Sequence, residues 1–156
     1  MSRLHLLAFV AAVLVTAAFV RCGRSALNPS QAASLEQGIL TDYLGMQSQL
    51  IADGTEGVGN AARLVASKAE RLGAKAAAIA GAAHELERAA SLDQTREAYS
   101  RLSQAVMEYG SGDKASVLSG VRVAYCPMLN KKWLQKGTEI RNPYAGPKML
   151  DCGVLE

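Results

Sequence analysis

The sequence contains few of the side chains that most enzymes and metal proteins rely on. Its 156 residues include two histidines and three cysteines, and only 5% are aromatic. Beyond residue 25 the sequence has Cys126, Cys152 and His84, whereas a structural zinc site usually needs four Cys or His ligands. It has no nucleophile elbow, phosphate-binding loop or pair of carboxylates in a catalytic motif, and a hydrolase would have His84 as its single histidine base. The sequence therefore argues against an enzyme.

Acidic residues are absent from the first 25 positions, which contain three arginines. Arg3 precedes a nearly continuous apolar run from Leu6 to Val20. A positive segment followed by about 7–15 apolar residues is typical of a secretory signal peptide, and the run is shorter than the roughly 20 residues that span a membrane. We predict a signal peptide over residues 1–25 and a periplasmic protein, or an inner-membrane anchor if the leader is retained. Arg21, directly before Cys22, argues against a lipoprotein.

The rest of the chain has no excess of either charge. Beyond the three leader arginines, 14 basic residues face 14 acidic ones. Proteins that bind nucleic acids or anionic lipids usually have a strongly basic face. We therefore expect no nucleic-acid partner, and membrane contact only through an uncleaved leader.

Abundant alanine and scarce aromatics favour helices over a sheet. We predict a polar linker over residues 26–33 and a helical domain over residues 34–156. Apolar residues at three- and four-residue spacings indicate four helical segments, and Ser34 with Gln37 and Ser91 with Gln94 have the spacing of capping boxes. Short turns between such segments are typical of an up-and-down bundle. The predicted fold is all-α, a four-helix up-and-down bundle.

The composition changes after residue 112, where three of the four prolines, the single tryptophan and Cys126 and Cys152 occur. The segment from Val117 to Tyr125 alternates only partly, so it can be extended or helical. Large anchoring side chains are rare in disordered chains. We predict an irregular tail rich in cysteine and proline, packed on the bundle, with a motif region over residues 117–153.

Four sulfur-bearing residues of this tail are candidate ligands: Cys126, Met128, Met149 and Cys152. Thiolate and thioether sulfurs are soft donors, which suit Cu(I) and Ag(I). The alternative is that Cys126 and Cys152 form a disulfide that fixes the tail, which would stabilise the fold by about 3–4 kcal/mol on the chain-entropy model. A redox pair is the weakest of the three interpretations because the C-x-x-C spacing is missing.

The same region resembles a bacterial family that is defined as a domain of unknown function. The resemblance is carried by Tyr125-Cys126-Pro127-Met128, Trp133-Leu134-Gln135, Asn142-Pro143-Tyr144, Gly146 and Met149-Leu150-x-Cys152-Gly153. It extends from about Leu35 to Gly153, with departures at Leu129 and Ala145 and a shortened stretch between Met128 and Trp133.

Members of this family are small exported proteins or domains joined to periplasmic adaptor subunits of Cus-type copper and silver efflux systems, and the domain is described as heavy-metal-associated. The resemblance implies a helical domain and an accessory role in efflux, with such an adaptor as a partner. The resemblance does not imply which residues would bind a metal ion.

Overall fold

The structure is a computed structural model, and it describes residues 26–111 and 117–156. The predicted signal peptide lies outside these residues. The described residues form four α-helices, Pro29–Ile51 (α1), Val58–Leu72 (α2), Ala77–Glu87 (α3) and Leu92–Gly110 (α4), and a short 3-10 helix, Ala74–Ala76 (η1), precedes α3. The prediction of four helices is confirmed. None of the helices in the described part of the chain is both long enough and apolar enough to cross a membrane.

The C-terminal region is more regular than we predicted. It contains the strands Arg122–Cys126 (β1), Lys131–Gln135 (β2) and Val154–Leu155 (β3), and a 3-10 helix, Gly146–Met149 (η3). The strands form an antiparallel sheet in the order β2-β1-β3. The predictions of an all-α fold and of an irregular tail were therefore too narrow. The strands of five, five and two residues are too short to give a clear alternating pattern.

The first helix begins five residues earlier than the predicted boundary at residue 34. Asn28 is the N-cap, and its side chain accepts a hydrogen bond from the Gln31 backbone N–H while the Gln31 side chain accepts from the Asn28 N–H. Pro29 occupies the first helical turn, where its missing N–H has no cost. The predicted linker over residues 26–33 is thus mostly helix, and Asn28 and Gln31, not Ser34 and Gln37, form the capping box.

The start of α4 follows the sequence prediction. Ser91 is its N-cap and accepts a hydrogen bond from the backbone N–H of Gln94. The Gln94 side chain accepts from Ala90 rather than from Ser91. Gly110 is the last residue of the helix.

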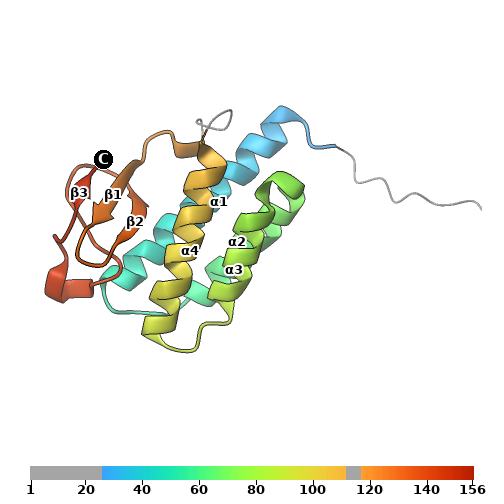
Figure 1. The fold of residues 1–156 in the computed structure, drawn as a ribbon. Helices are drawn as coiled ribbons and strands as arrows, with labels where there is room; N and C mark the ends of the chain where they lie inside the picture. Colours follow the sequence, from blue (N-terminus) through green and yellow to red (C-terminus); the bar gives the residue numbers. More distant parts are fainter. Residues whose placement is uncertain (1–25, 112–116) are drawn as a thin grey trace, which may run out of the picture.

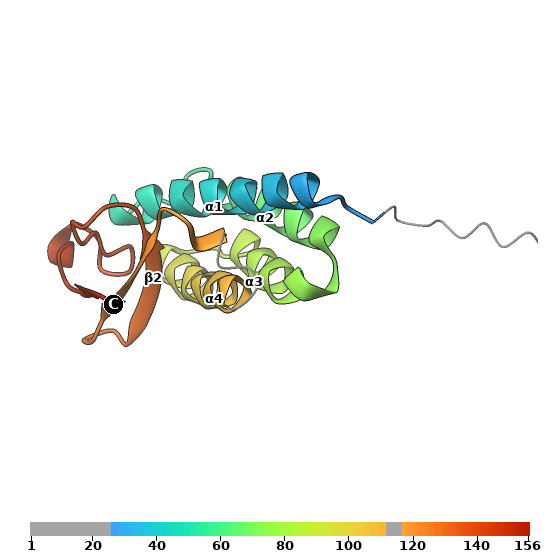
Figure 2. The same ribbon diagram turned by 90° about the horizontal axis from the view of Figure 1, so that it is seen from above.

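The helices are arranged in chain order, with α2 next to α1, α3 next to α2 and α4 next to α3. The strands lie together on one side of the helices, next to α4, which β2 contacts (Figures 1 and 2). A single core runs from the helices into the sheet, because Tyr43, Leu102, Trp133 and Leu134 are all fully buried in one apolar cluster.

Buried hydroxyl groups join the sheet to the helices. The Tyr43 hydroxyl of α1 accepts a hydrogen bond from the Leu134 backbone N–H of β2 and lies 2.7 Å from the Ser103 hydroxyl of α4. The Tyr144 hydroxyl is 3.1 Å from Ser103 and donates to the Lys132 carbonyl. Burial raises the pKa of Tyr43 above the ordinary tyrosine value, because it disfavours the charged phenolate. The network fixes the position of β2 on the helices.

Gly45 offers a test of α1 that does not touch the core. It lies in the middle of the helix, is exposed, and a Cβ built there meets nothing within 4 Å. Because glycine loses more backbone entropy than alanine on entering a helix, we expect Gly45→Ala to raise the free energy of unfolding by about 0.5–1 kcal/mol. Urea denaturation measures the change. A loss of stability would mean that α1 is not a continuous helix through this position.

Candidate functional site

The structure brings Cys126 and Cys152 together. Their sulfur atoms are 2.8 Å apart, although 26 positions separate them in the chain. Both are free thiols, Cys126 fully buried and Cys152 partly exposed. This meeting of two distant thiols is what the sequence interpretation required.

The sheet causes this approach. Cys126 ends β1, and Val154 of β3 pairs with Tyr125, the residue before it. Gly153, between Cys152 and β3, lies so close to the Trp133 ring that a Cβ there would be 2.8 Å from it. The absence of a side chain at Gly153 therefore lets Cys152 pass beside the end of β1. The strand pairing, not a flexible turn, sets the distance between the two sulfurs.

The Cys126 sulfur lies in a pocket of hydrogen-bond donors. Burial by itself raises the pKa of Cys126, but hydrogen bonds from the Cys152 thiol, from the backbone N–H groups of Leu129 and Met128 and from the Asn142 side chain together lower it below the ordinary cysteine value. The pKa of Cys152 is raised, first by its hydrogen bond to Cys126 and then by burial. Both directions agree with a hydrogen bond in which the Cys152 thiol donates to the Cys126 sulfur.

Asn142 connects the parts of the site. It is fully buried, and its side-chain nitrogen donates to the Cys152 carbonyl at 2.8 Å, while its side-chain oxygen accepts from the Tyr144 N–H at 2.8 Å. Its own backbone N–H donates to the Leu150 carbonyl. The sequence interpretation used Asn142 only as part of a motif and did not assign it this role. A buried asparagine before a proline was the available signal, but its partners depend on how the loop returns to β1.

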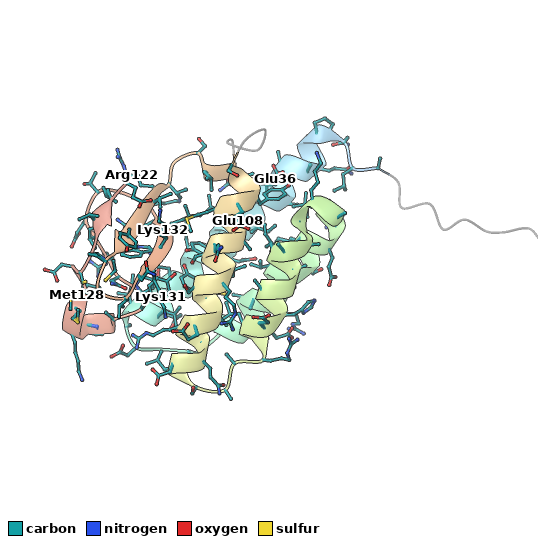
Figure 3. All side chains as sticks on the ribbon, in the orientation of Figure 1. Glu36, Glu108, Arg122, Met128, Lys131 and Lys132 are labelled. Atoms are coloured by element: carbon teal, nitrogen blue, oxygen red, sulfur yellow. The ribbon has the colours of Figure 1, made fainter. Side chains whose placement is uncertain are left out.

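The two methionines of the predicted ligand set occupy different segments. Met128 lies in the turn between β1 and β2 and is 73% exposed (Figure 3). Met149 is the last residue of η3, three positions before Cys152, and is half-buried. The structure thus brings the two cysteines together, whereas each methionine is near one cysteine in the chain only.

Among residues 26–111 and 117–156 there is no group of three or more His, Cys, Asp or Glu side chains arranged to hold a metal. His84 lies elsewhere, on α3, where it contacts Glu70 and Glu87 at 2.9 and 3.4 Å. An ion bound by Cys126 and Cys152 would therefore need further ligands other than His, Asp or Glu side chains. Methionine thioethers are the soft donors nearest to the two cysteines in the chain.

The observed separation of the sulfurs lies between two chemical states. A disulfide bond is about 2.05 Å long. Two thiolates on one tetrahedral ion, with bonds of about 2.3 Å, would be roughly 3.8 Å apart. The sulfurs are 2.8 Å apart, so a change of about 1 Å or less in their separation gives either the disulfide or the ion-bound pair. Cys152 has more room to move because it is partly exposed.

Comparisons of the chain with models of protein families, with curated proteins and with solved structures find no match.

Proposed function

We propose that this protein binds a soft monovalent ion, Cu(I) or Ag(I), through the thiolates of Cys126 and Cys152, with Met128 and Met149 as additional thioether donors. The observation that carries the proposal is the pair of adjacent sulfurs, one of them surrounded by N–H donors. A soft ion binds thiolate rather than thiol, so a site that stabilises the deprotonated sulfur before the ion arrives lowers the cost of binding.

The proposed setting is the periplasm, with the helices as a scaffold. We propose that the four helices form an up-and-down bundle, that residues 1–25 direct export, and that the ion is passed to a periplasmic efflux adaptor. The sequence resemblance around Cys126 and Cys152 supports that partner. The protein acts as a carrier or accessory in this proposal and not as an enzyme.

A structural module fixed by a Cys126–Cys152 disulfide is the second candidate. One observation favours it: at 2.8 Å the sulfurs are closer than two thiolates that share one ion. In that case the cross-link holds β3 against β1, and the methionines are ordinary packing or surface residues.

Competition with a coloured Cu(I) chelator tests the ion proposal. The reduced protein should retain one equivalent of Cu(I) at chelator concentrations that strip Cys126→Ser and Cys152→Ser, because each variant has lost one thiolate. Met46→Leu is a matched control, since Met46 is a buried core residue of α1 and the variant should hold the ion as the wild type does. Equal losses by the wild type and both cysteine variants would rule out the proposal.

Free-thiol counting, followed by the same Cu(I) competition, separates the two candidates. Protein isolated from the periplasm should give two reactive thiols after denaturation if the pair serves ion binding. A count of zero, together with loss of Cu(I) to the chelator even after reduction, is the result expected for the structural module.

A further inference from the structure

The two thiols differ in access. Cys126 is fully buried, while Cys152 is partly exposed. Thiol–disulfide exchange requires an incoming thiolate to approach one sulfur of the disulfide along the line of the sulfur–sulfur bond. If the pair is oxidised, an external thiol can reach the Cys152 sulfur and not the Cys126 sulfur.

The buried sulfur is the leaving group because of its position. The two sulfurs lie 2.8 Å apart, and attack on the partly exposed Cys152 sulfur leaves the electron pair of the broken bond on the fully buried Cys126. Access therefore selects a single direction of attack.

We propose that Cys126 and Cys152 form a redox-active pair that exchanges disulfide for dithiol with a partner thiol, in which Cys152 is the sulfur attacked and Cys126 is the leaving group. The inference deepens the proposed function, because it uses the same two sulfurs and makes ion binding depend on their oxidation state. Asn142 is a positioning residue, because its side-chain nitrogen donates to the Cys152 carbonyl at 2.8 Å.

The exchange proceeds in two balanced steps. A partner thiolate attacks the Cys152 sulfur, the bond between Cys126 and Cys152 breaks, and its electron pair remains on Cys126 as a thiolate. A second partner thiolate then attacks the partner sulfur of the mixed disulfide and releases Cys152, which takes up the proton of that second thiol. The partner is oxidised to a disulfide, and the protein gains two electrons as a free dithiol. With a partner disulfide the same steps run in reverse and oxidise the protein.

Trapping with glutathione disulfide tests the direction of attack. The protein is kept metal-free with a chelator, so that the trapping rate does not depend on ion binding. We expect Cys126→Ser, which keeps the accessible Cys152, to form the mixed disulfide readily, and Cys152→Ser to form it at least 10-fold more slowly because its remaining thiol is buried. Mass spectrometry of the quenched protein gives both rates. Equal rates, or faster trapping in Cys152→Ser, would overturn the assignment.

Reduction of the oxidised protein across a series of glutathione ratios tests the positioning role of Asn142. Asn142→Asp keeps the oxygen that accepts from the Tyr144 N–H but replaces the nitrogen that donates to the Cys152 carbonyl with a carboxylate oxygen. We expect its disulfide to be about 10-fold easier to reduce, a shift of about 30 mV for a two-electron couple, because Cys152 is no longer held beside Cys126. A purely structural asparagine would leave the ratio at half reduction unchanged, and circular dichroism confirms that the variant is folded.

Failure of this proposal can be distinguished from failure of the ion proposal. A wild-type disulfide that resists every glutathione ratio, in a protein that binds Cu(I) once reduced by a stronger agent, would reject the redox pair and leave the ion site standing. The opposite result, ready exchange without Cu(I) retention, would reject the ion site alone.

Discussion

Replacing Trp133 with alanine is expected to lower the free energy of unfolding by about 3–5 kcal/mol, the range for removing a large aromatic side chain from a core. Trp133 is fully buried in β2, its ring is edge-on to Tyr144 with centroids 5.9 Å apart, and its ring N–H donates to Gln135. It also contacts Gly153 closely enough to exclude a side chain there. The variant should therefore weaken the site as well as the core, since the segment with Cys152 rests on this ring.

Urea denaturation followed by circular dichroism measures the loss. Trp133→Phe is the matched control, because it keeps an aromatic ring beside Tyr144 and removes the hydrogen bond to Gln135. We expect it to cost about 1–3 kcal/mol, less than the alanine variant. A Trp133→Ala protein within about 1 kcal/mol of the wild type would mean that the sheet does not share the core of the helices.

Gly146→Ala is expected to cost about 2–4 kcal/mol, from two sources. Gly146 has φ +62°, a conformation that is strained for residues with a side chain, and a Cβ there would collide with the Asp53 carboxylate. It would also lie 2.6 Å from the Arg96 guanidinium. Arg96 is 13% exposed and donates to Asp53 at 2.5 Å and to the carbonyls of Leu50 and Pro143 at 3.1 Å. The added methyl group would thus disturb the contact that joins α4, the end of α1 and the loop before η3.

Gly120→Ala separates the two sources. Gly120 has a similar φ of +79°, but a Cβ there meets nothing within 4 Å. This variant carries the backbone strain without the collision, so we expect a cost of about 1 kcal/mol. The midpoints of thermal unfolding for the two variants compare them directly. Equal losses would show that the Arg96 contact contributes little to stability.

Helix boundaries were predictable wherever one residue type decides them. Ser91 and Gly110 bound α4 because a hydroxyl at the N-cap and a glycine at the end meet local requirements of the backbone. The start of α1 was missed, although Asn28, Pro29 and Gln31 contain the whole signal. Pro29 occupies the one helical turn that tolerates proline, so here it marks the start of a helix and not a linker.

The sheet was not predictable in the same way. Lys131 and Lys132 begin β2 (Figure 3) and make it look polar. The Lys131 ammonium nevertheless pairs with Glu97 on α4, and Lys132 pairs with Glu156. These partners are distant in the chain, so no local pattern reveals them. The meeting of Cys126 and Cys152 could be expected from the sequence, but its cause, the pairing of β1 with a two-residue β3, could not.

The strand order β2-β1-β3 also sets the sequence of events in folding. The hairpin of β1 and β2 is local, whereas β3 joins only after the loop that carries η3 has returned across the ring of Trp133. Local hairpins form within microseconds, and closing a longer loop costs more chain entropy. Cys126 therefore lies at an unpaired edge of β1 until β3 pairs with that strand. In an oxidising compartment, that interval is when the nascent chain is most exposed to pairing with the wrong thiol.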